Sequence, residues 1–361
     1  MSEQLELKTP ANTSLPLITE RSLVNQIMEA RLNTRIFPRG EIIMPCVPAF
    51  LENYVQRLEK LFDSLGKRFT PEEMTHLRGI LEPKLQQGFA LSPHSNIVFR
   101  YEPNKPPALG ISYNVGVATS SVADQYNSWV ETREPPLFGS HPDAKVMDVA
   151  AKIEGSPAKV KILDVGAGTG RNTLPLARLG YKLEVLELTP AFVEQLQKAA
   201  EEENLTVKAM QGDILDPLVR LRPSNYQLVI CVEVVASHFR DADQLRLLLA
   251  KMCDYLCKGG LFLFSAFIAV DGYDPDQIVR EMSQIVWSTI FTNAELNSAL
   301  EDLPLELISN ESVFDYERDR LPQEAWPPTG WFNNWAKGRD LFPIENGEPP
   351  MELRWILCKR V

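Results

Sequence analysis

The chain has 361 residues, of which 44% are apolar and 24% are charged. This composition is typical of globular proteins and excludes global disorder. Its 37 basic and 48 acidic side chains give a formal charge of −11. Because an acidic surface repels phosphate backbones, nucleic acid is not an expected partner.

The sequence predicts neither a membrane span nor a signal peptide. Its most apolar stretch, 260–270, is well short of the roughly 20 residues that a membrane helix needs. The N-terminal residues include acidic side chains and prolines in place of the apolar run of a signal peptide. Five cysteines, an odd number spread over apolar segments, indicate reduced and buried thiols. We therefore expect a cytoplasmic protein without membrane contact.

Residues 1–18 are polar and contain two prolines, which indicates a flexible tail. After them, apolar residues at helical spacing predict two amphipathic helices, over 23–32 and 50–65. Thr70 and Glu73 then form the pattern of a capping box, which predicts the start of a third helix.

The third helix is expected to end near Gly88, and two strands, 97–101 and 109–117, follow it. The stretch 103–107 between these strands is too rich in proline for a tight hairpin turn. Residues 19–118 are therefore predicted to form a helical region with a strand pair, acting as a cap or a dimerisation surface.

The second part of the chain alternates strands with helices. Continuous apolar runs, typical of strands covered on both faces, occur at 160–165, 183–188, 228–232 and 261–267. Helices are predicted over 190–203 and over 242–257, the latter closed by Gly259. This alternation predicts an α/β fold with a parallel sheet.

A further helix near 277–300 and two late strands, 305–316 and 351–359, complete a domain that we place at 119–361. The segment 317–350 inserts tryptophans and prolines between the two late strands. Insertions of that length inside a compact domain are usually functional or disordered.

The segment 162–170 reads ILDVGAGTG, a predicted buried strand that runs into a turn with three alternating glycines. Such glycines let the backbone bend sharply and let a ligand approach closely. Glu187 ends the next strand, where a carboxylate can accept both hydroxyls of a ribose. Asp213 follows the third strand region, where it could take an adenine amino proton while Ile214 packs against the ring.

Taken together, these segments resemble a class I S-adenosylmethionine-dependent methyltransferase of the small-molecule type. The resemblance covers about 126–267 and extends more loosely to the end of the chain. The spacing G-x-G-x-G differs from the G-x-G-x-x-G of NAD-binding folds. The resemblance implies a Rossmann-like sheet, mostly parallel with an antiparallel last strand, an N-terminal mainly helical extension, and S-adenosylmethionine as cofactor.

The resemblance also implies where the cofactor would bind. The implied residues are Asp164, Gly166, Gly168 and Gly170 around the methionine moiety, Glu187 at the ribose, Asp213 and Ile214 at the adenine, Glu233 at the aminoacyl side, and Leu188 as a further cofactor contact.

Methyl transfer requires mainly an oriented nucleophile, because the sulfonium is already activated. His238 follows the fourth strand at the sheet edge where ligands bind, so it could act as a general base. It could equally pack beside the cofactor without moving a proton. Tyr126 precedes the core by the distance at which similar enzymes place a tyrosine over the active site. It is the second catalytic candidate, whereas Arg133 is equally well explained by an amphipathic helix.

The insertion supplies tentative substrate residues. Trp326, Trp331 and Trp335 could line an apolar or cationic substrate, or simply pin the insertion in place. His141 is a weaker candidate. No metal site is expected, since Cys253 and Cys257 lack further ligands nearby.

The function that these observations predict is methyl transfer to an O, N or S atom of a small molecule. The fourth strand ends without the Asn-Pro-Pro-Tyr type of motif with which base amino methyltransferases hold an exocyclic nitrogen. Protein methylation and a non-catalytic S-adenosylmethionine-binding scaffold remain alternatives. The N-terminal region could mediate a homodimer.

Overall fold

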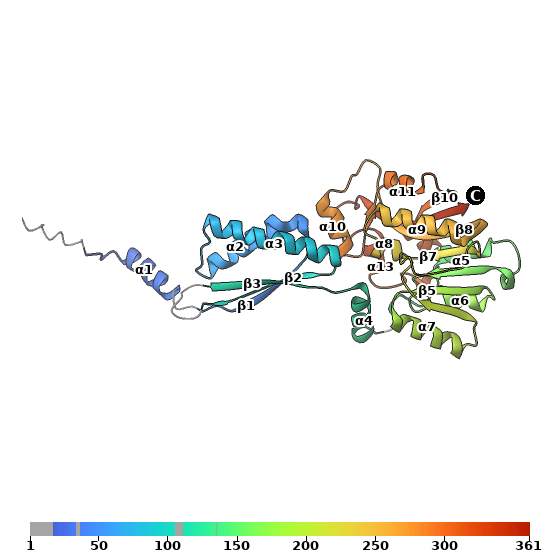
Figure 1. Ribbon diagram of the computed structural model, residues 1–361, viewed down its shortest axis with the longest axis horizontal. Helices are drawn as coiled ribbons and strands as arrows, with labels where there is room; N and C mark the ends of the chain where they lie inside the picture. Colours follow the sequence, from blue (N-terminus) through green and yellow to red (C-terminus); the bar gives the residue numbers. More distant parts are fainter. Residues whose placement is uncertain (1–16, 34–36, 105–110, 135) are drawn as a thin grey trace, which may run out of the picture. The chain divides into compact units, whose positions relative to one another are not determined.

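The computed structural model describes residues 17–33, 37–104, 111–134 and 136–361. They divide into two compact units, whose elements Figure 1 labels. The first unit takes the described parts of 1–43, 52–81 and 98–116, and the second takes those of 44–51, 82–97 and 117–361. The sequence suggested a single boundary near residue 118, whereas the second unit also includes two earlier segments.

The elements up to residue 118, some of which have residues in both units, are α1 (Arg21–Asn33), β1 (Gly40–Pro45), α2 (Leu51–Ser64), α3 (Pro71–Leu91), β2 (Asn96–Pro103) and β3 (Ile111–Ala118). The three strands form one sheet in the order β1-β2-β3. Strand β1 was not predicted. The expected tail is described only from Leu17 onward, and residues 105–110 of the expected strand pair and its connection also lie outside the described residues.

An aromatic core stabilises the first unit. The ring of Phe62 is fully buried and meets Phe69, Phe99 and Tyr101 edge to face, with centroids 5.1 to 5.7 Å apart. The predicted capping box is confirmed, because the backbone N–H of Thr70 donates to the Glu73 carboxylate at 2.8 Å. The Glu73 N–H donates in return to the Thr70 hydroxyl at 3.2 Å.

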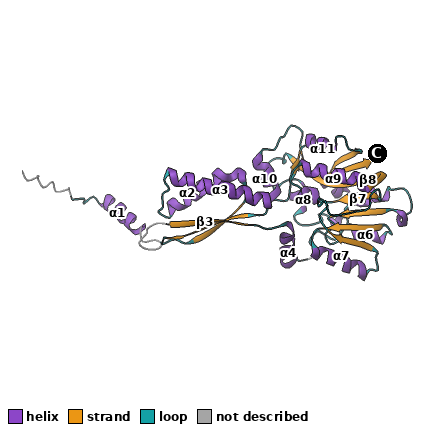
Figure 2. Ribbon diagram, in the orientation of Figure 1, coloured by secondary structure: helices purple, strands orange, loops and turns teal. Residues whose placement is uncertain are grey.

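The second unit is built on a mostly parallel sheet of eight strands. Its order is β10-β11-β8-β7-β4-β5-β6, and β9 pairs with β8. Only β11 breaks the parallel arrangement, since it is antiparallel to both β8 and β10. This is the predicted Rossmann-like sheet with an antiparallel last strand. Figure 2 shows helices on both sides of it.

The strands of this sheet are β4 (Lys161–Val165), β5 (Lys182–Glu187), β6 (Val207–Gln211), β7 (Tyr226–Cys231), β8 (Leu256–Ala269), β9 (Ile290–Phe291), β10 (Leu305–Ser312) and β11 (Met351–Arg360). The helices are α4 (Val122–Thr132), α5 (Ala144–Ala151), α6 (Thr173–Arg178), α7 (Pro190–Glu202), α8 (Val234–His238), α9 (Ala242–Tyr255), α10 (Gln277–Ile285), α11 (Asn293–Leu300), α12 (Val313–Arg320) and α13 (Phe332–Ala336).

Alternation along the strands places two apolar cores on the two faces of the sheet. In β4, Leu163 and Val165 belong to the core that includes α9 and α11. Ile162 points to the opposite face and belongs to the core that includes α5, α6, α12 and α13. Strands covered on both faces must be apolar at every position, which explains the continuous apolar runs of the sequence.

Three predicted boundaries were wrong. Helix α9 ends at Tyr255, because Leu256 is extended and pairs with Tyr226 at the start of β8. Cys257 therefore lies on a strand and does not share a helix face with Cys253. The helix predicted near 277–300 is divided by β9, and the strand predicted to reach residue 316 ends at Ser312, whose hydroxyl caps α12.

None of the described helices combines the length and the apolar character that crossing a membrane requires. All five cysteines are free, and burial raises the pKa of the Cys46 thiol to about 11. Across the described ranges, no three His, Cys, Asp or Glu side chains are grouped so that they could hold a metal ion.

Candidate active site

The turn after β4 lies at the point where the sheet order reverses, since β4 pairs with β5 on one side and with β7 on the other. Ligands of open α/β sheets bind at this position. Gly166 has a φ of +71°, and a Cβ added to it would lie 2.2 Å from Cγ2 of Val234. Only glycine fits there, and its bare backbone borders a pocket.

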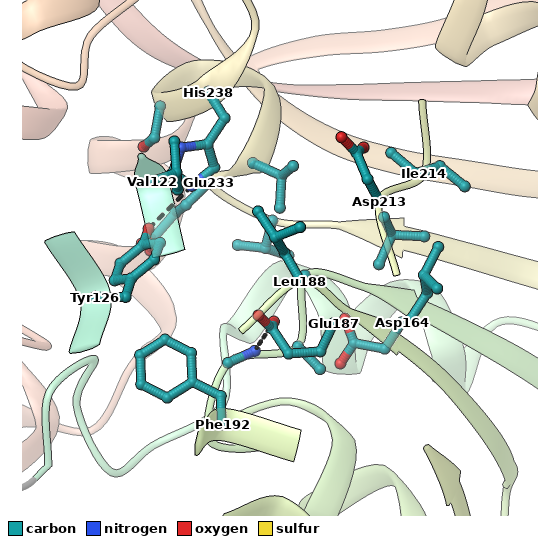
Figure 3. Close-up of a pocket in the computed structure, with 18 of the residues that line it drawn as sticks. Val122, Tyr126, Asp164, Glu187, Leu188, Phe192, Asp213, Ile214, Glu233 and His238 are labelled. Atoms are coloured by element: carbon teal, nitrogen blue, oxygen red, sulfur yellow. Dashed lines mark hydrogen bonds between the residues drawn. The ribbon is translucent and has the colours of Figure 1, made fainter. Parts of the chain in front are cut away.

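The pocket has a volume of about 230 Å³ and lies over the carboxyl ends of β4, β5 and β7 (Figure 3). It brings together nearly all the predicted catalytic and cofactor-binding residues: Tyr126, Asp164, Gly166, Gly168, Glu187, Leu188, Asp213, Ile214, Glu233 and His238. Gly170 does not line it. With a φ of +94°, Gly170 shapes the turn into α6 instead.

Glu187 connects the ends of two neighbouring strands. Its carboxylate accepts the backbone N–H of Gly168 at 2.9 Å and that of Thr189 at 2.8 Å. Burial raises the pKa of Glu187, although these hydrogen bonds act in the opposite direction. Carboxylate oxygens have further lone pairs, so Glu187 can accept hydrogen bonds from a ligand as well.

The two aspartates of the pocket have different environments. Asp164 is buried at the end of β4 and accepts a hydrogen bond from the Thr173 hydroxyl at 2.5 Å. Burial raises the pKa of Asp164 to about 7. Asp213 is exposed and accepts the backbone N–H of Leu215 at 2.8 Å, while Ile214 beside it is buried.

Arg171 is a pocket residue to which the sequence assigned no role. Its guanidinium is buried and donates to Asp143 at 2.6 Å and to Glu233 at 2.9 Å. Asp143 also accepts a hydrogen bond from the Asn172 amide at 2.8 Å. Arg171 stands directly after the glycine motif, but its partners are 28 and 62 positions away, so no local pattern reveals the pair.

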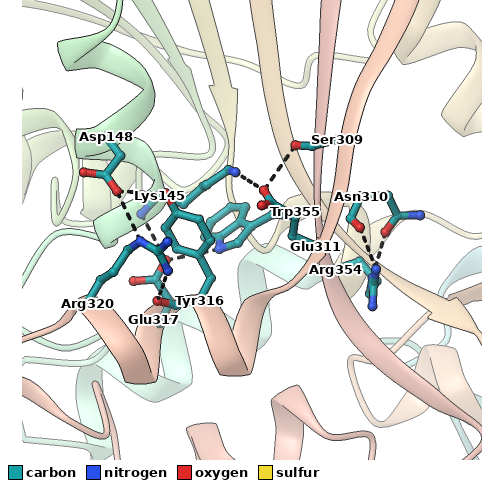
Figure 4. Close-up of polar contacts among 10 residues, drawn as sticks. All are labelled: Lys145, Asp148, Ser309, Asn310, Glu311, Tyr316, Glu317, Arg320, Arg354 and Trp355. Atoms are coloured by element: carbon teal, nitrogen blue, oxygen red, sulfur yellow. Dashed lines mark hydrogen bonds and ion pairs between the residues drawn. The ribbon is translucent and has the colours of Figure 1, made fainter.

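A second polar cluster supports the segment that carries Asp143 (Figure 4). Glu317 on α12 is fully buried and accepts the N–H groups of Ala144 and Lys145 at the start of α5, at 2.7 and 3.1 Å. The indole N–H of Trp355 donates to it at 3.1 Å. Burial raises the pKa of Glu317 to about 7.

The two predicted catalytic residues are hydrogen-bonded to each other. The hydroxyl of Tyr126 on α4 lies 2.9 Å from Nε2 of His238 at the end of α8. Burial lowers the pKa of His238 to about 3 and raises that of Tyr126 well above its usual value. Both side chains are therefore neutral near pH 7.

Aromatic side chains missed by the sequence analysis complete one wall of the pocket. Phe138 and Phe192 line it and lie 5.4 Å apart, ring centroid to centroid. Both rings also contact Tyr126, at 6.1 and 5.3 Å. Phe138 lies in a loop and Phe192 in α7, so neither carries a motif that could have indicated it.

The structure does not bring the insertion tryptophans or His141 to the pocket. Trp335 is buried against Phe267 of β8, and Trp326 packs on aromatic residues of its own region. Trp331 is 36% exposed, and His141 contacts the neighbouring Ser140. Trp335 thus packs the insertion on the sheet, while Trp326 and Trp331 pack on aromatic residues beside it.

Residues 162–260 match the protein family described as a methyltransferase domain. Together with the sheet order and the glycine turn, this match identifies a domain of the class I S-adenosylmethionine-dependent methyltransferase superfamily.

Among curated relatives, the ubiquinone biosynthesis O-methyltransferase of Rickettsia akari (strain Hartford) is 32% identical over 95 residues, 26% of this chain and 36% of that protein. TehB of Haemophilus influenzae (strain 10810), described as a probable S-adenosyl-L-methionine-dependent methyltransferase, is 31% identical over 122 residues, 34% and 40% of the two chains. The chain therefore spans well under two thirds of the length of these relatives. Among solved structures, the geranyl diphosphate C-methyltransferase of Streptomyces coelicolor A3(2) has 15% identity and a TM-score of 0.47, over 60% of this chain and 76% of that one.

Proposed function

We propose that this chain transfers a methyl group from S-adenosylmethionine to an O, N or S atom of a small molecule. The observation that carries the proposal is the convergence of the glycine turn, Glu187 and Asp213 on one pocket at the reversal point of the sheet. Each of the three follows a different strand, and together they match the polar groups of a nucleoside with an aminoacyl chain.

The residues present fit this cofactor. The Gly166 turn offers backbone where a Cβ would clash, Glu187 offers acceptors for ribose hydroxyls, and Asp213 with Ile214 offers a polar and an apolar contact for adenine. Glu233 stands on the aminoacyl side. When bound, S-adenosylmethionine supplies a methyl group whose bond to sulfur breaks as the acceptor's electron pair forms the new bond.

Tyr126, His238 and the rings of Phe138 and Phe192 form the acceptor end of the pocket in this proposal. Aromatic walls exclude water and orient an apolar acceptor body. The names of the ubiquinone biosynthesis O-methyltransferases among the relatives support oxygen as the methylated atom. A cytoplasmic location, a homodimer formed through residues 19–118, and acceptor contacts by Trp326, Trp331, Trp335 and His141 stay predictions.

The test is calorimetric titration of the full chain with S-adenosylhomocysteine, with NAD as the control ligand. We expect binding of the first ligand alone, and a loss of about tenfold or more in Glu187→Ala, because charged hydrogen bonds contribute about 1.5–3 kcal/mol. Glu184→Ala is the matched control on the same strand, since Glu184 bonds to Tyr226 and does not line the pocket.

Absence of S-adenosylhomocysteine binding in the folded wild type would refute the cofactor assignment. Binding that Glu187→Ala leaves intact would refute the placement of the ribose. Binding without methyl transfer to any compound of a broad acceptor screen would favour the scaffold alternative.

A further inference from the structure

Trp287 contacts both members of the Tyr126–His238 pair without lining the pocket. Its ring lies 5.7 Å from Tyr126 and 5.3 Å from His238, the latter edge to face at 86°. The Trp287 ring also stacks on the ring of His94, with the two centroids 4.1 Å apart. Trp287 therefore stands at the centre of an aromatic block behind the acceptor end of the pocket.

The backbone of Trp287 is held in a conformation that a bulky side chain rarely adopts. Its φ is +58°, just after α10, where large residues are strained by about 1–2 kcal/mol. The indole N–H of Trp335 donates to the Trp287 carbonyl at 2.9 Å. The aromatic insertion thus reaches the site indirectly, by fixing the residue that packs on Tyr126 and His238.

Tyr126 and His238 have different neighbours, which indicate that Tyr126 is the member of the pair nearer the aromatic wall of the pocket. The ring of Tyr126 contacts the pocket rings of Phe138 and Phe192, at centroid distances of 6.1 and 5.3 Å. The ring of His238, by contrast, contacts Tyr126 at 5.6 Å and Trp287 at 5.3 Å, and Trp287 in turn stacks on His94. Nδ1 of His238 is buried and has no hydrogen-bond partner among the described residues. Its other ring nitrogen, Nε2, is the one that lies in hydrogen-bond contact with the Tyr126 hydroxyl (Figure 3).

We propose that Tyr126 and His238 form a proton relay in which the Tyr126 hydroxyl meets the acceptor, His238 stands behind it, and Trp287 is the positioning residue for both. The relay requires His238 to carry its proton on Nδ1, so that Nε2 accepts the hydrogen bond from Tyr126. This inference rests on the proposed methyl transfer, and it names the path of the proton.

The relay moves one proton from the acceptor to His238. The acceptor loses its proton to the Tyr126 oxygen, while the Tyr126 hydroxyl proton moves to Nε2 of His238. Tyr126 is neutral before and after, and His238 becomes an imidazolium that later releases the proton to solvent. Because burial lowers the pKa of His238 to about 3, the relay suits an acceptor hydroxyl, which becomes strongly acidic as the new bond forms. A methylated amine is too weak an acid to protonate this imidazole.

The test reads the tautomer of His238 directly and needs no substrate. Full-length protein labelled with ¹⁵N-histidine is studied by long-range ¹H–¹⁵N correlation at pH 7.5. The chain has four histidines, and His238→Gln identifies the signal of interest. We expect one tautomer in the wild type, protonated on Nδ1, and a mixture of both in Tyr126→Phe.

In Trp287→Asn, which keeps a residue tolerant of positive φ but removes the ring, we expect the same mixture, with S-adenosylhomocysteine affinity within about twofold of wild type. Trp326→Asn is the control, because it removes an insertion tryptophan whose ring contacts in the described chain are Phe314 and Phe332, and not the pair or Trp335. If Trp287→Asn does not fold, Trp335→Phe removes the donor to the Trp287 carbonyl, keeps an aromatic ring at this buried position, and should shift the tautomer balance less, in the same direction.

A wild-type His238 protonated on Nε2 would overturn the relay order. An unchanged tautomer in Trp287→Asn and Trp335→Phe would overturn the role of Trp287. Failure of the proposed function is distinct from both, since it appears as absent S-adenosylhomocysteine binding in wild-type protein with the expected tautomer.

Discussion

Arg171 donates to Glu233 at 2.9 Å inside the pocket, with both side chains largely shielded from solvent. The same guanidinium donates to Asp143 at 2.6 Å, so one cation compensates two carboxylates. Removing one partner of such a buried group leaves uncompensated charge, which costs about 3–5 kcal/mol. Arg171 therefore holds Asp143 and Glu233 together at this side of the pocket.

Arg171→Met is expected to lower the free energy of unfolding by about 3 kcal/mol at pH 8 in urea titrations. The loss should be smaller at pH 5. Without the cation, nothing opposes the effect of burial, which raises the pKa of Glu233 above its unfolded value, so its contribution to stability is retained at low pH and lost as pH rises. Arg178→Met, which breaks an exposed pair with Glu203, should cost under about 1 kcal/mol. Equal losses in the two variants would contradict the buried-pair interpretation.

Gly166→Ala tests the close approach at the turn. The new Cβ would lie 2.2 Å from Cγ2 of Val234 at a φ of +71°. We therefore expect the free energy of unfolding to fall by about 3 kcal/mol and S-adenosylhomocysteine to bind at least tenfold more weakly. Adding Val234→Ala should recover the part of this loss of stability and binding that is due to the clash. Gly180→Ala isolates the backbone cost, because it has a φ of +88° and its nearest contact is at 4.0 Å. No recovery in the double variant would show that the clash is relieved elsewhere.

Glu317 makes the free energy of unfolding of the second unit depend on pH. Burial raises its pKa from 4.5 to about 7, so the folded state binds the proton more tightly than the unfolded state does. Its stabilising contribution is complete below about pH 4.5 and declines as pH rises through 7, by roughly 2 kcal/mol. Urea titrations between pH 5 and 8 should show a steeper decline for wild type than for Glu317→Gln. Parallel pH profiles would be inconsistent with a raised pKa.

Arg240, between α8 and α9, joins the last residues of α3, which belong to the second unit, to α10. Its guanidinium donates to the carbonyls of Phe89 and Ala90 near the end of α3, and its Nε donates to Gln284 at 3.1 Å. Arg240→Lys keeps the charge but loses the planar set of donors, so we expect faster amide hydrogen exchange at 88–92, corresponding to about 1–2 kcal/mol.

Arg246→Lys is the matched control for this measurement, because Arg246 donates to carbonyls at the end of α11. It should speed exchange there and leave α3 unchanged. Unaltered exchange at 88–92 in Arg240→Lys would mean that apolar packing alone holds this part of α3.

Much of the fold follows from local patterns in the sequence. Continuous apolar runs and helix caps predicted the parallel strands and the helices between them, because burial on both faces and capping chemistry act over a few residues. The glycine motif, Glu187 and Asp213 predicted the cofactor pocket for the same reason. Each follows a strand, and parallel strands bring their carboxyl ends to one edge of a sheet.

The elements that were misjudged depend on distant partners. Strand β1 exists only because it pairs with β2, and α9 ends at Tyr255 because Leu256 pairs with Tyr226 in the sheet. Such pairing energy comes from residues far along the chain, so no local pattern records it.

The sequence alone predicted an α/β sheet and the residues that the structure brings to one pocket at its edge. Only the tertiary structure decided that Arg171 compensates Glu233, that Tyr126 bonds to His238, and that Trp287 packs on both. These relations join residues tens to hundreds of positions apart. They arise because buried charges, donors and rings require partners, and the packing of the whole domain selects which residues those are.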